Sequence, residues 1–141
     1  MNNILTFSLF FVVFFASDLQ AQQSEDKGPE IFSYEDGDTT YVMQKYFLCL
    51  LKTGPVREQD EETAAKIQKE HRAHLNWLAE SEQICLAGPS QDHEEVQGFV
   101  LYRVATIEKA IELANMDPAV KAGRLIVDVI PWWAAQGSKL Y

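Results

Sequence analysis

The order of apolar runs along the chain constrains the fold most. After Lys45, every residue up to Leu51 is apolar, which is typical of a strand that is buried on both faces. Three more short apolar runs follow, together with two stretches of helical periodicity. They predict strands at 45–51, 83–87, 98–105 and 124–130, helices at 61–81 and 107–115, and a short helical turn at 118–122. This β-α-β-β-α-β order predicts an α+β, ferredoxin-like fold, with both helices on one face of a four-stranded antiparallel sheet.

The same apolar pattern bears on assembly. The first strand is apolar on both faces, and in the last one Ile126 and Ile130 alternate with further apolar residues. Two helices can cover only one face of the sheet, so the other face would expose a large apolar surface. We therefore expect a homodimer, in which a second copy of the chain covers that face.

The first residues differ from the rest of the chain. Residues 4–16 carry no charge and contain five of the eight phenylalanines. As a helix they would span roughly 20 Å, which is short for a membrane crossing. This composition predicts a cleaved signal peptide at 1–21, cut after Ala21, and an exported, periplasmic or secreted protein. The segment before Ile4 carries no Lys or Arg, which fits a signal poorly, and a buried first helix or strand is the alternative.

The remaining chain divides into three parts. Residues 22–44 are acidic and rich in turn residues, and they predict an N-terminal extension or linker. Within it, Asp36-Gly37-Asp38 predicts a turn, because the other ligands of a calcium loop are missing. Residues 45–134 form the predicted domain, and residues 135–141 form a C-terminal tail.

The charge of the chain excludes two classes of partner. The chain contains 12 basic and 21 acidic residues, and its formal net charge is −9. Nucleic acid and anionic lipid surfaces both require clustered Lys and Arg. We therefore expect no nucleic-acid partner, and no membrane partner after signal cleavage.

Cys49 and Cys85 fall on the first and second predicted strands. In the usual strand order 4-1-3-2 the third strand separates them by about 10 Å, beyond the ~7 Å between Cα atoms that a disulfide tolerates. We expect two free, buried thiols.

His71 is the most informative polar residue. In the helix at 61–81, one stripe about 100° wide contains Ala64, Ile67, His71, His74, Leu75 and Leu78. A histidine in the middle of this stripe is either a general acid or base at the wall of a pocket, or a core histidine whose nitrogens bond to backbone carbonyls or water.

The other histidines carry weaker signals. His71 and His74 could hold a metal, but this would need a further ligand, and the local sequence is not the HExxH arrangement. His93 lies among acidic loop residues and is expected to be solvated. The sequence contains no nucleophile elbow, phosphate-binding loop or dinucleotide fingerprint, so covalent hydrolase and nucleotide-dependent functions have no support. We expect no metal and no cofactor.

Asp117 has a structural explanation and a functional one. It precedes Pro118, a favoured first helical residue, and this predicts that Asp117 caps the helical turn. One carboxylate oxygen would serve the cap, and the other would remain free to orient the ring of His71.

Several segments together resemble the YCII-related (YciI-like) domain family of the dimeric α+β barrel superfamily. They are Tyr46-Phe47-Leu48, the stretch from Ile67 to His71, the stretch from Leu86 to Pro89, Gly98-Phe99, the stretch from Asp117 to Leu125, and Pro131-Trp132. The resemblance covers residues 45–133.

The resemblance implies a ferredoxin-like fold, a homodimer formed through the sheets, and an active site of one His and one Asp, which match His71 and Asp117. The family includes a dehydrochlorinase of a chlorinated hydroxyhydroquinone, so elimination by proton transfer is one precedent. A signal peptide departs from the mostly cytoplasmic pattern of the family.

The leading hypothesis is a small cofactor-independent enzyme, in which His71 and Asp117 transfer a proton during an elimination or isomerisation of a small molecule. The alternative is a non-catalytic dimeric module that binds a small ligand or a protein. A purely structural dimer is the third possibility.

Overall fold

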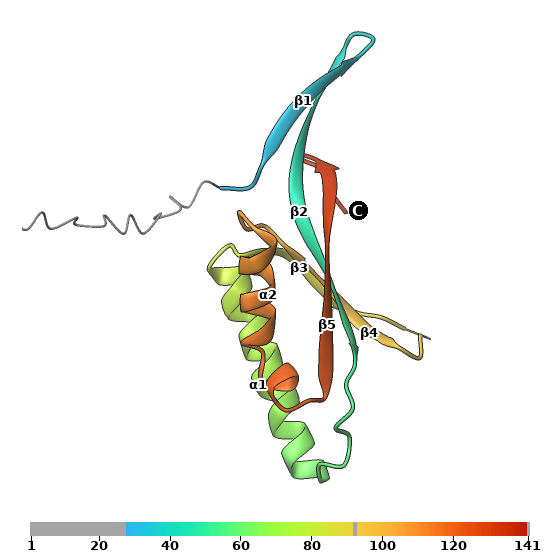
Figure 1. Cartoon of the computed structure of the whole chain (residues 1–141), viewed down its shortest axis with the longest axis vertical. Coiled ribbons are helices and arrows are strands. Elements are labelled where there is room, and N and C mark those ends of the chain that lie inside the picture. The colour runs from blue at the N-terminus through green and yellow to red at the C-terminus, as the bar shows by residue number, and fades with distance from the viewer. Residues whose placement is uncertain (1–27, 92, 141) are drawn as a thin grey trace, which may run out of the picture.

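The structure, a computed structural model, describes residues 28–91 and 93–140 of the chain. The predicted signal peptide at 1–21 lies outside the described residues. The elements in chain order are β1 (Ile31–Asp36), β2 (Thr39–Thr53), α1 (Glu61–Glu80), β3 (Ile84–Pro89), β4 (Val96–Tyr102), α2 (Ile107–Asn115), α3 (Pro118–Lys121) and β5 (Leu125–Ala135), as Figure 1 shows.

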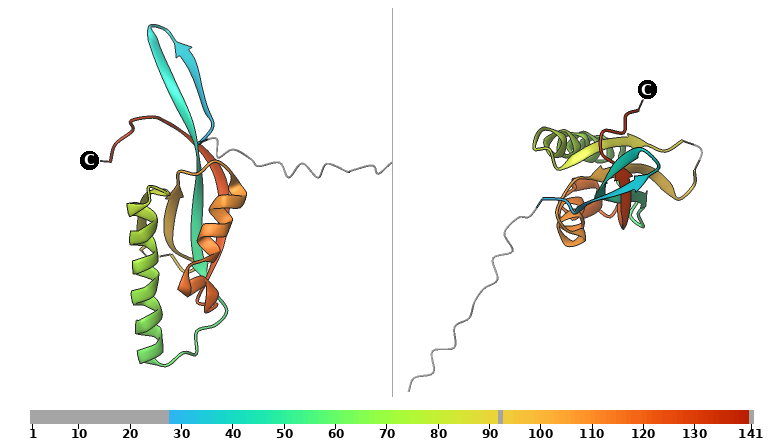
Figure 2. Two further views of the ribbon diagram at one scale, coloured as in Figure 1. Left: turned by 90° about the vertical axis from the view of Figure 1, so that its left-hand side faces the viewer. Right: turned by 90° about the horizontal axis from the view of Figure 1, so that it is seen from above.

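The strands form one antiparallel sheet around β2. Residues 47–52 of this strand pair with β4, and residues 43–53 pair with β5. Strand β3 pairs with the far side of β4, so the four predicted strands have the order 4-1-3-2. Both long helices lie on one side of this sheet (Figure 1 and Figure 2). The predicted ferredoxin-like fold is confirmed.

The core lies between the helices and the inner face of the sheet. Phe47, Cys49 and Leu51 of β2 are buried there, while the residues between them face the other side and are half-buried. The core also includes Leu78, Ile84, Val100, Tyr102, Val104, Ala110, Leu113, Ala114, Ala119 and Leu125.

Helix α1 follows its predicted pattern. Asp60 caps it by accepting a hydrogen bond from the Thr63 amide at 2.7 Å. The six residues of the predicted stripe, from Ala64 to Leu78, are the only residues of α1 that are not exposed. No helix in the described part of the chain is long and apolar enough to cross a membrane.

Helix α2 differs from its prediction in one residue of its inner face. Thr106 caps the helix as expected, with an oxygen 3.2 Å from the Lys109 amide. Ile111, which the periodicity placed inside, is 39% exposed, and Leu113 is buried instead. The helix packs through positions 110, 113 and 114, which are spaced i, i+3, i+4, and this stripe excludes position 111.

The segment at 22–44 was predicted to be an extension or linker, and its described part is not a linker. Residues 31–36 and 39–44 form a β-hairpin that projects from the end of the sheet (Figure 1). Asp36-Gly37-Asp38 makes the turn, as predicted, and Gly37 has a φ of 59° that favours glycine. Aromatic contacts hold the hairpin: Tyr34 stacks on Tyr41 at 5.2 Å between ring centroids, and Phe32 meets Trp133 edge-on at 4.8 Å. The C-terminal tail was predicted to start at residue 135, and Ala135 is in fact the last residue of β5.

The two cysteines are free, as predicted, but only Cys49 is buried. Cys85 is exposed because β3 is the edge strand and its register shifts between Ile84 and Leu86. Burial raises the pKa of the Cys49 thiol to about 12, and the charges of Asp117 and Asp128 add to this effect.

We therefore expect one fast-reacting thiol in the native protein. A thiol-specific chromogenic reagent at pH 8 should label Cys85 first, because Cys49 has no exposed surface and almost no thiolate at that pH. Cys49 should react only in denaturant. The Cys85→Ser variant is the control, and a fast-reacting thiol in that variant would contradict the placement of Cys49.

The outer face of the sheet carries no helix, and most of its side chains are apolar. Four of its exposed apolar residues are Phe99 of β4 and Ile126, Ile130 and Trp132 of β5, between 36% and 48% exposed, and the ion pair of Lys52 with Asp128 lies on the same face. We call these four residues the open sheet face. Leu48 pairs with Ile130, and Tyr46 pairs with Trp132, so the face continues across β2.

Candidate functional site

His71 reaches the interior because of its position on α1. It lies four residues after Ile67 and four before Leu75, on the stripe that packs against the sheet. The residue is 8% exposed, and it is one of three polar or charged residues that are buried in the described chain.

Asp117 is held by the ends of two helices. It lies seven residues after Ala110 and so continues the buried stripe of α2. Its Oδ1 accepts a hydrogen bond from the Ala119 amide at 2.8 Å, and Pro118 occupies the first turn of α3. The predicted cap is confirmed, and Asp117 is 3% exposed.

The structure brings these two side chains together. Nδ1 of His71 lies 2.6 Å from Oδ2 of Asp117, so the oxygen that is not used by the cap binds the ring. This distance is typical of a charge-assisted hydrogen bond, and we assign Nδ1–H as its donor. Since Asp117 is fixed by the Ala119 amide, it also fixes the orientation of the imidazole.

The groups around the carboxylate stay neutral. Burial raises the pKa of Cys49, and it raises the pKa of the Tyr102 phenol, with further contributions from Cys49 and Asp117. Both residues are buried in the core.

His71 also lines a cavity of about 440 Å³. The walls come from α1, the paired ends of β3 and β4, and the turn before β5. They include Leu51, Leu75, Gly88, Pro89 and Leu125. Within the described chain the second ring nitrogen, Nε2, has no hydrogen-bond partner and is not enclosed among buried atoms. The arrangement thus combines an oriented ring with an open space that can hold a small molecule.

Three arginines, which the sequence analysis did not single out, line the same cavity: Arg57, Arg72 and Arg124. They come from the loop before α1, from α1, and from the turn before β5. The only local signal was the position of Arg72 directly after His71. Arg57 and Arg124 gave no signal in the sequence, since only the fold brings these distant positions to the same cavity.

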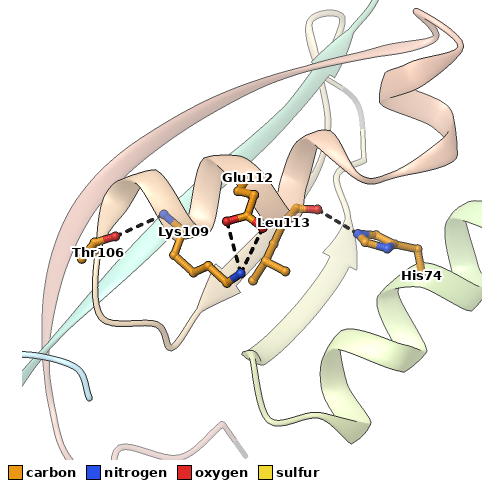
Figure 3. A network of polar contacts seen from close by, with 5 residues as sticks. All are labelled: His74, Thr106, Lys109, Glu112 and Leu113. Atoms are coloured by element: carbon orange, nitrogen blue, oxygen red, sulfur yellow. Dashed lines mark hydrogen bonds and ion pairs between the residues drawn. The ribbon is translucent and has the colours of Figure 1, made fainter. Parts of the chain in front are cut away.

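His74 has a structural role. Its Nε2 lies 3.0 Å from the carbonyl oxygen of Leu113, and Figure 3 shows the ring extending from α1 to this carbonyl on α2. The bond joins the two helices. In the part of the chain that the structure describes, no group of three or more His, Cys, Asp or Glu side chains is placed to hold a metal.

His93 is exposed on the loop before β4, as expected. Its Nδ1 accepts a hydrogen bond from the Val96 amide at 2.9 Å, and the Glu95 amide lies 3.3 Å away. The ring orders the loop and lies outside the cavity described above.

Three comparisons relate the chain to known proteins. A search of curated proteins finds no match to the chain. Among solved structures, the chain is similar to 5-chloro-2-hydroxyhydroquinone dehydrochlorinase from Burkholderia phenoliruptrix AC1100, in a complex with 2,5-dihydroxybenzoquinone. The TM-score is 0.46 at 21% identity, and the match covers 62% of this chain and 92% of that one. The family model of the YCII-related domain matches residues 46–133, which is more than half of the chain. The predicted resemblance is therefore confirmed, and the chain belongs to the YCII-related domain family.

Proposed function

We propose that the protein is a small enzyme that catalyses proton transfer on a small molecule with the pair His71 and Asp117. The observation that carries the proposal is the 2.6 Å contact between Nδ1 and Oδ2 beside an open cavity. A buried carboxylate that orients an imidazole, whose other nitrogen can reach a ligand, is the arrangement of a general base.

The proposed chemistry uses the two ring nitrogens differently. Nε2 removes a proton from a carbon of the bound molecule, while Nδ1–H stays bonded to Asp117 and the carboxylate stabilises the imidazolium. In an elimination, the electron pair of the broken C–H bond forms a C=C bond, and the leaving group departs with its own bonding pair. In an isomerisation, the imidazolium returns the proton to another carbon of the same molecule.

The test is a comparison of proton transfer between matched variants. A panel of small carbon acids, with and without a leaving group on the adjacent carbon, is incubated with the protein in D2O, and proton NMR follows loss of the C–H signal. We expect at least one compound to react, and His71→Gln to slow the reaction about 10²–10⁴-fold.

His74→Gln is the control, because His74 lies one turn away on the same helix and binds a backbone carbonyl. It should retain the rate. A reaction that persists in His71→Gln would contradict the proposal, and tight binding without any turnover would identify a non-catalytic binding module instead.

We further propose that the protein is exported and acts as a homodimer. The uncharged, phenylalanine-rich stretch at 4–16 supports export. Export predicts that the mature chain begins at Gln22, and an intact mass of the unprocessed chain in the cell interior would contradict it.

The open sheet face supports the dimer, because a second copy would remove its apolar side chains from water.

A further inference from the structure

We propose that the cavity beside His71 binds an oxyanion of its ligand, and that Arg57, Arg72 and Arg124 recognise it. The ligand class is a small organic carboxylate or phosphate with an apolar body. That such a ligand is a substrate rests on the proposed function, whereas its binding does not.

The distribution of charge is the first argument. The chain has four arginines and an excess of acidic residues, with a net charge of −9. Three of the four arginines line this one cavity, and its lining contains no Asp or Glu. Asp117 lies behind the ring of His71 and outside the lining. An acidic protein thus presents a basic surface at its candidate site, which favours an anionic ligand.

The second argument is that these guanidinium groups have no carboxylate partners among the described residues. In the described parts of the chain, none of the ion pairs involves Arg57, Arg72 or Arg124. The fourth arginine, Arg103, does have one: it pairs with Glu82 at 3.0 Å, away from the cavity. A guanidinium carries five N–H donors in a planar fork that matches carboxylate and phosphate oxygens, and these donors remain available in the cavity.

The third argument is that two of the arginines are held in place. Nη1 of Arg57 donates to the backbone carbonyl of Arg124 at 3.2 Å, and Nη1 of Arg124 donates to Oε1 of Gln59 at 2.7 Å. The backbone around them is tied as well, since the Gly54 amide donates to the Arg124 carbonyl at 2.8 Å. A side chain at position 54 would collide with the carbonyl oxygen of Gly123, so the close approach of these segments requires glycine there. Each contact uses one donor and leaves the others for a ligand.

The position of the arginines relative to His71 connects binding to chemistry. Arg72 follows His71 on α1, and all three arginines share the cavity with the ring. Removal of a proton from carbon leaves negative charge on the ligand, and fixed cations next to that carbon stabilise it. The apolar walls, which include Leu51, Leu75 and Leu125, can contact the body of the ligand. A volume of about 440 Å³ accommodates a ring that carries an acidic group.

The test uses calorimetric titration of the full mature chain with four probes of similar size: benzoate, phenyl phosphate, benzamide and benzylamine. We expect benzoate or phenyl phosphate to bind, and the stronger of the two identifies the preferred oxyanion. The neutral amide and the cationic amine should bind at least 10-fold more weakly. Arg72→Gln should weaken the binding of the preferred anion about 10- to 100-fold, because a charge-assisted hydrogen bond is lost.

Arg103→Gln is the matched control, because Arg103 lies outside the cavity, and its variant should bind the anion as the wild type does. Arg72 is an exposed residue of α1, so its variant removes no core contact and should fold. The proposal is overturned if benzamide binds as tightly as both anions, if neither anion binds at millimolar concentration, or if Arg72→Gln and Arg124→Gln bind within twofold of the wild type.

The same titration separates this inference from the proposed function. His71→Gln should bind the anion within a few fold of the wild type, although it loses proton transfer. Anion binding without any His71-dependent reaction would contradict the proposed enzymatic function but would support the anion site. A His71-dependent reaction on neutral compounds, with no preference for anions, would overturn the anion site alone.

Discussion

Asp117→Asn is expected to leave the protein folded and to slow His71-dependent proton transfer about 10²–10⁴-fold. The asparagine keeps an oxygen that can accept the hydrogen bond from the Ala119 amide, so the cap of α3 remains. Its NH2 group then faces Nδ1 of His71 as a donor. The ring must then accept a hydrogen bond at Nδ1 and carry its proton on Nε2. A protonated Nε2 has no lone pair with which to act as a general base.

The tautomer can be measured without a substrate. ¹⁵N NMR of the ring should show protonated Nδ1 in the wild-type protein and protonated Nε2 in Asp117→Asn. Asp128→Asn is the control for loss of a carboxylate, because the exposed Asp128 of β5 pairs with Lys52 of β2 and lies outside the cavity. An unchanged tautomer and an unchanged rate in Asp117→Asn would show that the carboxylate acts only as a cap.

Ile130→Asp is expected to dissociate the proposed homodimer, with a dissociation constant raised at least 100-fold. Ile130 is 45% exposed on the open sheet face and pairs with Leu48 of β2. In a dimer formed through this face, the new carboxylate would be buried without a partner, at a cost of several kcal/mol. In a monomer it would be solvated, so the fold should persist.

The measurement is size-exclusion chromatography with light scattering at micromolar concentration. Ile111→Asp is a matched control, since Ile111 is 39% exposed on α2 and is not part of the open sheet face. This variant should elute as the wild type does. A wild-type protein that is monomeric at micromolar concentration would contradict the proposed homodimer.

Local patterns predicted most of the secondary structure. The apolar residues of α1 and the caps at Asp60, Thr106 and Asp117 depend on neighbours within four positions, and the structure has all of them. The pairing of Asp117 with His71 was implied by the family resemblance, and the second oxygen of a capping carboxylate allows it. The catalytic role of the pair stays a prediction.

The predictions differ from the structure where a local sequence pattern is compatible with two structures. The acidic, turn-rich composition of 22–44 predicted an extension or linker, whereas the runs on either side of Asp36-Gly37-Asp38 pair as a hairpin at 31–44. Ile111 and Leu113 both fit an apolar stripe, and packing selected Leu113. Cys85 is apolar in character, yet its edge strand leaves it exposed.

The sequence by itself determined the order of the elements after residue 45, the buried side of α1, and the residue types that can move a proton. Periodicity and capping are local, so they can be read without knowing the fold. Only the tertiary structure decided the shape and charge of the cavity. Arg57 and Arg124 are 67 positions apart, and they meet because β2 and β5 are neighbours in the sheet and their ends lie beside His71. Contacts between such distant residues depend on the packing of whole elements, which no local spacing encodes.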